Sequence, residues 1–274
     1  MGFSSEVLAL ERRGGVCTLW LNRPEKHNAL SLEMWSDLPL ALAEIGADDS
    51  ARVMILAGRG KSFCSGIDMA ALASLGRKQG AASQATANLR GFHATASFQA
   101  GITALAECPV PVIAAIHGAC VGGGVDLITA CDIRLAAEGS RFSVRETKMG
   151  LAADVGSLQR LPKVLTAGHV AELVYTGKDI DAERARAIGL VNEVYPDQDA
   201  LLRAANALGD EIAANAPLAV RGSKFMLRHA EDLTTEQSLL LNNLWTAATN
   251  LPSNDMTEAI KAFMEKRAPE FTGT

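Results

Sequence analysis

The chain has 274 residues, of which 48% are apolar and 21% are charged, and its formal net charge is −5. A chain of this length and composition can bury a substantial core without disulfides or metal ions, which excludes an intrinsically disordered protein. The acidic balance also argues against a dedicated nucleic-acid-binding protein, because such a protein needs a basic patch or stripe.

The first part of the chain contains strand and helix patterns in turn. Residues 6–21 alternate polar and apolar positions around a Gly-Gly pair, which predicts a β-hairpin. A helix is predicted from Ser31, and Pro39 is expected to kink it or to end its first part. Residues 52–57 are continuously apolar after the first position, which is typical of a buried strand.

The middle of the chain repeats this alternation. An alanine-rich helical stretch covers 67–106 with an interruption around 76–80, and a second buried strand is predicted at 110–116. A glycine turn, a helix at 125–130 and a strand at 132–136 follow. Because these strands alternate with helices and are continuously apolar, the pattern indicates a parallel α/β sheet.

The character of the chain changes near its C-terminus. A short strand, LVNEVY, follows Gly189, and residues 197–268 then show amphipathic helical segments without a strand pattern. We therefore expect an α/β core over residues 1–196 and a helical C-terminal region over residues 197–274.

The cysteines and histidines show no spacing typical of a disulfide framework, a redox pair or a metal site. We expect the five thiols to be free, buried and in a reducing compartment. The N-terminus lacks the pattern of a secretory signal, and the longest uncharged stretch contains prolines and a glycine cluster that make it a poor membrane span. These patterns predict a cytoplasmic protein without a membrane segment or a metal. The cysteines are Cys17, Cys64, Cys108, Cys120 and Cys131.

The most unusual local sequence is HGACVGGGVDL at 117–127. Its three consecutive glycines stand between a predicted strand and a predicted helix, where they would let a ligand approach free N–H groups at the start of the helix. Such groups suit a developing oxyanion or a phosphate. The alternative is a tight turn packed against a neighbouring segment. The order of the glycines matches neither a dinucleotide-binding fingerprint nor a P-loop.

A second glycine turn, GKSFCSGIDM at 60–69, follows the strand predicted at 52–57. It could present another main-chain donor at the carboxyl edge of the sheet, where open α/β sheets bind ligands. Ser65 is disfavoured as a nucleophile, because the sequence has no G-x-S-x-G elbow around it.

Three acidic residues lie in or near the glycine-rich segments. Asp126 follows the glycine run, Glu146 comes twenty residues later, and Asp154 lies in the small, apolar segment GLAADVGS. From the sequence alone, Asp154 is either a cap for the helix that follows or a desolvated carboxyl with a raised pKa.

These motifs together resemble those of the enoyl-CoA hydratase/isomerase (crotonase) superfamily. The two glycine-containing motifs occur with NRPEKHNAL at 22–30 and AFMEKR at 262–267, which resemble a CoA-contacting loop and the C-terminal helix of that family. Within the family, 122–164 is most similar to the Δ3,5-Δ2,4-dienoyl-CoA isomerases. The resemblance implies a spiral of ββα turns with a helical C-terminal region, assembled as a homotrimer or homohexamer.

The resemblance also implies catalytic roles. The N–H groups of Ile67 and Gly123 would form an oxyanion hole for the thioester carbonyl of an acyl-CoA. Isomerisation of a 3,5-dienoyl-CoA to the 2,4-isomer, in fatty-acid degradation, removes a proton at C2 and adds one at C6. Glu146 would be the base at C2, Asp154 the acid at C6, and Asp126 would tune Glu146.

Substrate contacts are implied by the same matches, and CoA is part of the substrate rather than a separate cofactor. The turn at 65–69 would line the acyl-CoA, the 22–30 loop would follow its nucleotide part, and the C-terminal helix would reach a CoA, that of a neighbouring subunit included. The residues concerned are Lys26, Ala29, Ser65, Gly66, Ile67, Asp68, Met69, Gly123, Phe263 and Lys266.

Two alternatives remain at this stage. An enoyl-CoA hydratase would carry glutamates at the positions of Asp126 and Glu146 and a glycine at that of Asp154, so the sequence departs from the hydratase pattern at two of three positions. A binding protein without turnover should lose the acidic residues and keep the glycine turns, whereas this chain keeps both.

Overall fold

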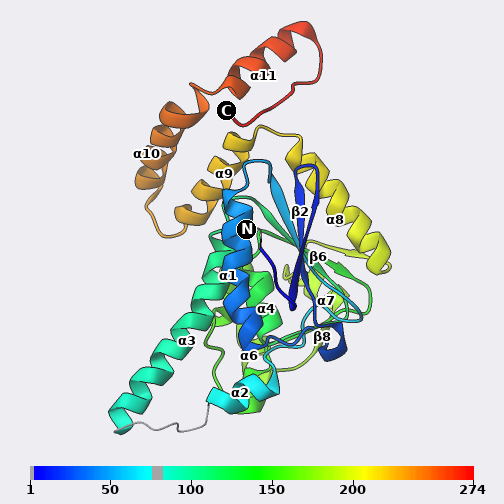
Figure 1. The fold of residues 1–274 in the computed structure, drawn as a ribbon, viewed down its shortest axis with the longest axis vertical. Helices are drawn as coiled ribbons and strands as arrows, with labels where there is room; N and C mark the ends of the chain where they lie inside the picture. The colour runs from blue at the N-terminus through cyan, green and yellow to red at the C-terminus, as the bar shows by residue number, and fades with distance from the viewer. Residues whose placement is uncertain (1–2, 76–82) are drawn as a thin grey trace.

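The computed structural model describes residues 3–75 and 83–274, and its centre is a six-stranded sheet (Figure 1). The strand order is β1-β2-β3-β4-β6-β9, and every neighbouring pair is parallel except the β1–β2 hairpin. Both the hairpin and the parallel sheet predicted from the sequence are confirmed. The strands are β1 (Leu8–Arg13), β2 (Val16–Leu21), β3 (Val53–Gly58), β4 (Val112–Ile116), β6 (Ile133–Ala137) and β9 (Glu193–Tyr195).

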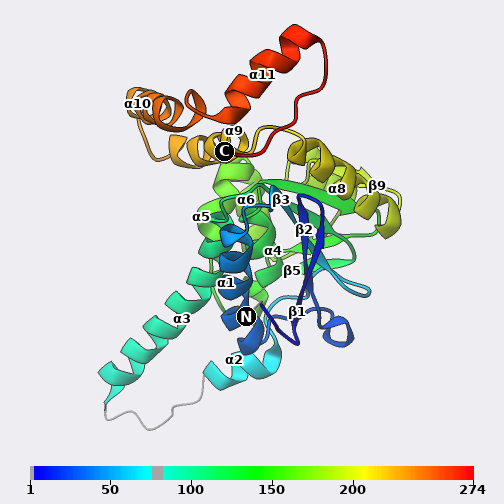
Figure 2. The same cartoon turned by 45° about the horizontal axis from the view of Figure 1, so that its top comes forward.

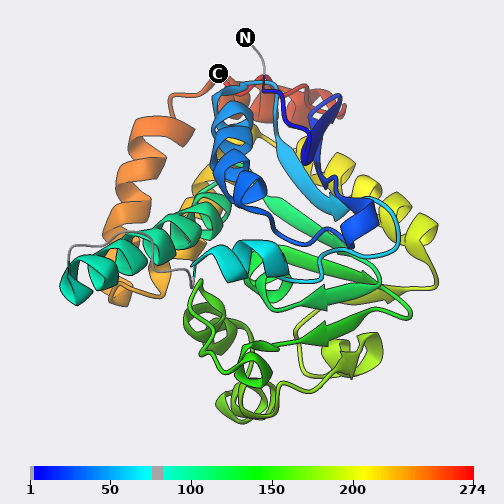
Figure 3. The same ribbon diagram turned by 60° about the horizontal axis from the view of Figure 1, so that its bottom comes forward.

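Strand β3 is apolar throughout because both of its faces are covered. Met54 and Leu56 belong to the larger core cluster, which also contains the buried face of α1 (Leu32–Ala47). Val53 and Ile55 point the other way, into a second cluster that includes side chains of α8 (Gln198–Ala213). Figure 3 shows α1 and α8 on opposite faces of the sheet. Alternate residues therefore face two different cores, which removes the polar half of the usual strand pattern.

Helix α1 begins where the sequence predicts, because the hydroxyl of Ser31 accepts a hydrogen bond from the N–H of Met34 at 3.2 Å. The expectation that Pro39 would end its first part is wrong, since the helix runs unbroken to Ala47. A proline removes one hydrogen bond from a helix, and here the buried apolar face of α1 holds the helix together across that position.

The region between β3 and β9 contains most of the remaining short elements. The predicted interruption at 76–80 lies outside the described residues, between α2 and α3. A second, three-stranded sheet of very short strands was not predicted. The helices are α2 (Met69–Leu75), α3 (Gln84–Ala106), α4 (Gly123–Thr129), α5 (Ser157–Val164), α6 (Ala167–Thr176) and α7 (Ala182–Ala187); the short strands are β5 (Ala119–Val121), β7 (Arg141–Ser143) and β8 (Ile180–Asp181); single helical turns are η1 (Pro24–Lys26) and η2 (Glu146–Met149).

The C-terminal region is helical, as predicted. Helix α8 packs on the sheet, whereas α9 (Pro217–Ala230), α10 (Thr235–Trp245) and α11 (Asn254–Glu265) continue beyond the core, with a π-helical turn after α10 (Figures 1 and 2). Many large apolar side chains of α10 and α11 are exposed. They are Leu239, Leu240, Leu244, Leu251, Met256, Ile260, Phe263 and Met264, where Leu251 lies between the two helices.

The packing answers one further sequence expectation, that of the free and buried cysteines. All five cysteines are free and buried, as predicted. Within residues 3–75 and 83–274, no helix is both long enough and apolar enough to cross a membrane.

Candidate active site

The two glycine turns lie side by side and present neighbouring main-chain N–H groups. A Cβ atom placed on Gly123 would lie 3.9 Å from the nitrogen of Ile67, and one placed on Gly66 would lie 3.8 Å from the nitrogen of Gly123. Neither N–H donates a hydrogen bond to another residue that the structure describes. Two adjacent free donors are the arrangement expected of an oxyanion hole.

Hydrogen bonds on either side of Ile67 leave its N–H free. The N–H of Leu30 donates to the carbonyl of Gly66 at 2.8 Å, and the N–H of Asp68 donates to the carbonyl of Leu30 at 3.0 Å. Gly66 and Gly122 have φ angles of +98° and +52°, which a residue with a side chain rarely adopts. The glycine-rich sequence is therefore needed for the turns themselves.

The third glycine of the run has a packing role. A Cβ atom on Gly124 would lie 2.9 Å from the carbonyl oxygen of Cys64, which is too close for any side chain. Close packing, the alternative stated for the glycine run, thus holds for Gly124, whereas Gly123 leaves an N–H group without a hydrogen-bond acceptor among the described residues.

Asp126 lies in α4, one turn after the glycines, and is fully buried. Its Oδ1 accepts hydrogen bonds from the N–H of Ser157 at 2.5 Å and from the hydroxyl of Ser157 at 2.7 Å. Its Oδ2 is buried without a hydrogen-bond partner. Burial raises the pKa of Asp126 to about 6, although the two hydrogen bonds from Ser157 oppose this shift.

Glu146 begins η2, and its carboxyl group lies against the glycine run at 122–124. Its Oε1 is 3.2 Å from the place that a Cβ on Gly122 would occupy, and its Oε2 is buried without a partner. Burial raises the pKa of Glu146 to about 7, its own backbone N–H opposes the shift, and the charges of Asp126 and Asp154 add to it. Near neutral pH this group can therefore either accept or release a proton.

Asp154 does not fulfil either expectation drawn from the sequence. It caps no helix, because the N-cap of α5 is Gly156. It is also exposed in this chain rather than desolvated. Its carbonyl oxygen accepts a hydrogen bond from the side chain of Gln99 at 2.6 Å. Its charge raises the pKa of both Glu146 and Asp126, so the carboxyl group lies within electrostatic reach of both.

The predicted CoA-contacting loop lies along the turn at 65–69. The N–H of Ser65 donates to the carbonyl of His27 at 3.0 Å, and the hydroxyl of Ser65 donates to the carbonyl of Lys26 at 3.4 Å. Asp68 forms an ion pair with Arg23 at 3.0 Å and accepts a hydrogen bond from the N–H of Ala70. The ion pair between Asp68 and Arg23 thus joins the turn at 65–69 to the loop at 22–30.

The remaining predicted contact residues differ in position. Ala29 is half-buried in the loop, and its carbonyl accepts a hydrogen bond from Arg23. Lys26 and Met69 are exposed beside it. Phe263 is 82% exposed and belongs to α11, and Lys266 follows that helix. Helix α11 and helix α2 lie at opposite ends of the molecule (Figures 1 and 2), so the chain does not bring these two residues to its own glycine turns.

The sequence reasoning missed Ser157 and the wall formed by Leu30 and Trp35. A Cβ on Gly123 would lie 2.7 Å from Cδ1 of Leu30 and 3.8 Å from Cζ2 of Trp35. Ser157 contacts Asp126 across 31 positions of the chain, and a single serine carries no local signal of such a contact. Its place directly after GLAADVG, where a helix begins, was the one available sign.

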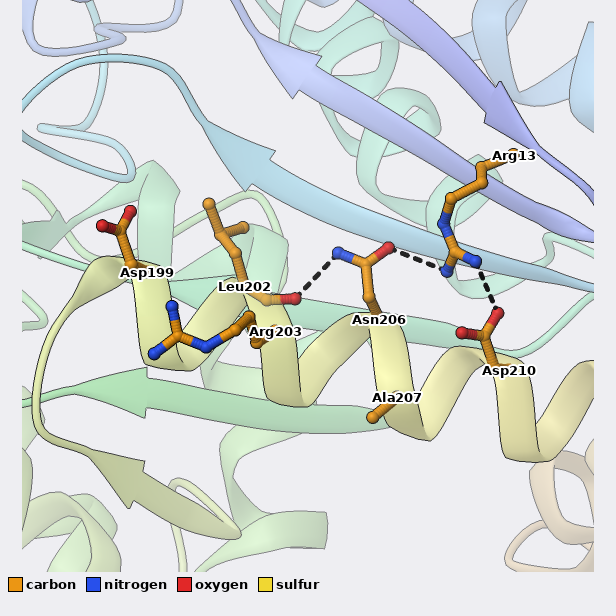
Figure 4. Close-up of a pocket in the computed structure, with 7 residues that line it drawn as sticks. All are labelled: Arg13, Asp199, Leu202, Arg203, Asn206, Ala207 and Asp210. Carbon is orange, nitrogen blue, oxygen red and sulfur yellow. Dashed lines mark hydrogen bonds and ion pairs between the residues drawn. The ribbon is translucent and has the colours of Figure 1, made fainter.

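A shallow pocket on α8 offers no comparable chemistry (Figure 4). Arg13 bridges Asn206 and Asp210 there, at 3.0 Å and 2.9 Å. Both ionic side chains are more than half exposed, and an ion pair of this kind contributes little to stability.

Comparisons with known proteins agree with this geometry. The family profile described as "Enoyl-CoA hydratase/isomerase" matches residues 11–274. A mitochondrial Delta(3,5)-Delta(2,4)-dienoyl-CoA isomerase of Dictyostelium discoideum is 42% identical over 97% of this chain and 91% of its own. The peroxisomal enzyme of that name from Arabidopsis thaliana is 39% identical over 97% of this chain and 96% of its own.

Solved structures agree on the fold. An enoyl-CoA hydratase from Bacillus anthracis superposes with a TM-score of 0.89 at 32% identity, covering 98% of this chain and 100% of its own. One from Mycobacterium tuberculosis H37Rv superposes with a TM-score of 0.84 at 31% identity, again over 98% and 100%. The resemblance and the fold class inferred from the sequence are confirmed, and the chain belongs to the enoyl-CoA hydratase/isomerase family.

Proposed function

We propose that this protein isomerises 3,5-dienoyl-CoA to 2,4-dienoyl-CoA by moving a proton from C2 to C6. The observation that carries the proposal is the pair of buried, unpartnered carboxylate oxygens of Asp126 and Glu146 next to two free main-chain donors. Relatives that are 39% to 42% identical to the chain and bear the name of this activity support it.

In the proposed reaction, the N–H groups of Ile67 and Gly123 donate hydrogen bonds to the thioester oxygen. Loss of the C2 proton spreads negative charge over a trienolate, from the thioester oxygen to C6. Because the two donors are fixed before the substrate arrives, each can stabilise the transition state by about 3 kcal/mol.

Glu146 takes the proton from C2, and Asp154 gives one to C6. The pKa of Glu146, raised to about 7, makes it a stronger base than an ordinary glutamate while leaving much of it ionised at neutral pH. The double bonds move from C3 and C5 to C2 and C4, so no atom is lost from the substrate. The proton that Glu146 gains and the proton that Asp154 gives up are then exchanged with solvent, which closes the cycle.

Hydration of a 2-enoyl-CoA is the second candidate, because the solved structures compared above are named as hydratases. It would use the same oxyanion hole. Asp154 stands where a hydratase is expected to have glycine, and this disfavours hydration because that glycine is expected to leave room for the attacking water.

We also propose that the protein acts in fatty-acid degradation, in the cytoplasm, as a homotrimer or homohexamer. The exposed apolar side chains of α10 and α11 support an assembly, since a monomer would leave them in water. In such an assembly Phe263 and Lys266 could contact a CoA bound to a neighbouring copy.

The test is a spectrophotometric assay of 3,5-dienoyl-CoA and 2-enoyl-CoA side by side, with Asp154→Asn as a matched variant. We expect the parent to isomerise the diene faster than it hydrates the enoyl thioester. Asp154→Asn should lower isomerisation by about two to four orders of magnitude, because it removes the exchangeable acid, while C2 exchange with deuterated solvent continues. Faster hydration than isomerisation in the parent would replace this function with the hydratase.

A further inference from the structure

The carboxyl group of Asp126 is held at one oxygen and left free at the other. Both donors on Oδ1 come from a single residue, Ser157, whose main-chain N–H and hydroxyl lie 2.5 Å and 2.7 Å away. Ser157 is itself fully buried and is the first residue of α5, so neither donor can exchange its partner for water. Oδ2 is buried without any partner among the described residues.

We propose that Ser157 is a positioning residue of this site, which holds Asp126 as an oriented anion beside Glu146 and thereby keeps Glu146 basic. Two donors on one oxygen fix the orientation of the carboxyl group, and both favour its charged form. The role assigned to Glu146 as the C2 base rests on the function proposed above.

Other charged and titratable groups face Asp126 from the surrounding elements, but none of them replaces Ser157. The thiols of Cys64 and Cys120 are neutral, since burial raises the pKa of each well above its usual value. The carboxyl groups of Glu146 and Asp154 oppose ionisation of Asp126, because their negative charges repel a third one. The guanidinium of Arg160 favours the ionised form of Asp126, but it donates its hydrogen bond to the hydroxyl of Thr103, at 3.3 Å. These groups are Cys64, Cys120, Glu146, Asp154 and Arg160.

The consequence for the reaction follows from the order in which the two carboxyls titrate. With a pKa of about 6, Asp126 is mostly ionised at pH 7, and its charge helps to raise the pKa of Glu146 to about 7. Without the hydroxyl of Ser157, the pKa of Asp126 rises, so a proton occupies Asp126 at a higher pH. A neutral Asp126 no longer raises the pKa of Glu146, which becomes a weaker base.

The experiment compares Ser157→Ala with the parent and with Ser140→Ala, a matched variant at another fully buried serine, whose hydroxyl bonds the carbonyl of Ile116. We expect Ser157→Ala to lower kcat for 3,5-dienoyl-CoA about tenfold, the effect of one hydrogen bond to a charged group, with KM within about twofold. The acid limb of the pH profile should move to higher pH. Ser140→Ala should change neither kcat nor the profile.

A double variant excludes a merely structural effect. In an Asp126→Asn background, Ser157→Ala should cost little further activity, because the group through which it acts is gone. An equal loss in both backgrounds, or a parent-like profile for Ser157→Ala, would overturn the proposal. If Ser157→Ala does not fold, Ser157→Cys makes the same comparison, since it keeps a weak donor and a similar side chain.

A titration that is independent of activity separates this inference from the proposed function. The carboxyl of Asp126 can be followed by carbon NMR of labelled aspartate, assigned with Asp126→Asn, in the parent and in Ser157→Ala. We expect the midpoint to move to higher pH in the variant. A shifted midpoint in a protein that does not isomerise dienes contradicts only the proposed function. An unshifted midpoint contradicts this inference, whatever reaction the site performs.

Discussion

Helices α4 and α10 show how differently two parts of this chain are packed. Every residue of α4 is buried, and its glycines and Asp126 are held by contacts within the same chain. No residue of α10 is buried, and α10 and α11 together expose a series of large apolar side chains. The two free main-chain donors and the buried carboxyls are therefore positioned within one copy, whereas the apolar surface of α10 and α11 is expected to require a second surface.

The largest effect is expected from Glu146→Gln, which tests whether the buried carboxyls do the chemistry. The amide keeps the size of the side chain but cannot accept the C2 proton, so isomerisation should fall by about two to four orders of magnitude. Exchange of the C2 proton with deuterated solvent should cease as well, which proton NMR can follow. Continued exchange at the parent rate would show that another group is the base.

Gly123→Val tests whether the main-chain N–H groups of Ile67 and Gly123 bind the thioester carbonyl. The added Cβ would lie 2.7 Å from Cδ1 of Leu30, and the side chain would fill the space that a carbonyl needs to reach the two N–H groups. We expect turnover to fall about a hundredfold, the effect of losing one oxyanion donor, with the fold retained by circular dichroism. A folded variant with parent activity would remove Gly123 from the oxyanion hole.

The double variant Phe263→Ser, Met264→Ser on α11 tests whether the exposed apolar surface of α10 and α11 is covered by another copy of the chain. The parent should have the mass of three copies or a multiple of three by light scattering, and the variant should shift toward the monomer because two exposed apolar side chains are lost. Tyr175→Ser, which removes a 79% exposed aromatic side chain of α6, is the matched control and should keep the parent mass. An active, monomeric parent would contradict the assembly.

The smallest effect concerns the pH dependence of stability. Because the folded pKa of Glu146 is raised to about 7, the folded state binds protons more tightly than the unfolded state between about pH 4.5 and 7. This carboxyl therefore favours folding at low pH, and its contribution is lost as pH rises, by on the order of 2 kcal/mol. Urea unfolding at pH 5 and pH 8, at one protein concentration, should show a smaller decline in Glu146→Gln than in the parent. Equal declines would contradict the raised pKa.

The parts of the fold that the sequence predicts are those with a strong local cause. The strand at 52–57 is recognisable because both of its faces are covered, and the two glycine turns because positive φ angles at Gly66 and Gly122 need glycine. The strands of the small sheet are two or three residues long, too short to show a periodic pattern.

The parts of the site that could not be predicted depend on contacts between distant segments. Ser157 matters because α5 starts opposite Asp126, which no spacing within either segment reveals. The cap expected at Asp154 is absent because the helix starts three residues later, after Gly156, where no side chain supplies the cap. The carboxyl of Glu146 acquires its raised pKa from burial and from neighbouring charges, and these are properties of the assembled fold.

The hydrogen bonds between the two glycine turns have a mechanical consequence. The N–H of Cys64 donates to the carbonyl of Ala119 at 2.9 Å, and the N–H of Val121 donates to the carbonyl of Cys64 at 3.0 Å. These bonds join the turns three residues before Ile67 and two before Gly123, so we expect the two donors to move together. A strain introduced at the root of either turn is therefore expected to displace both donors at once.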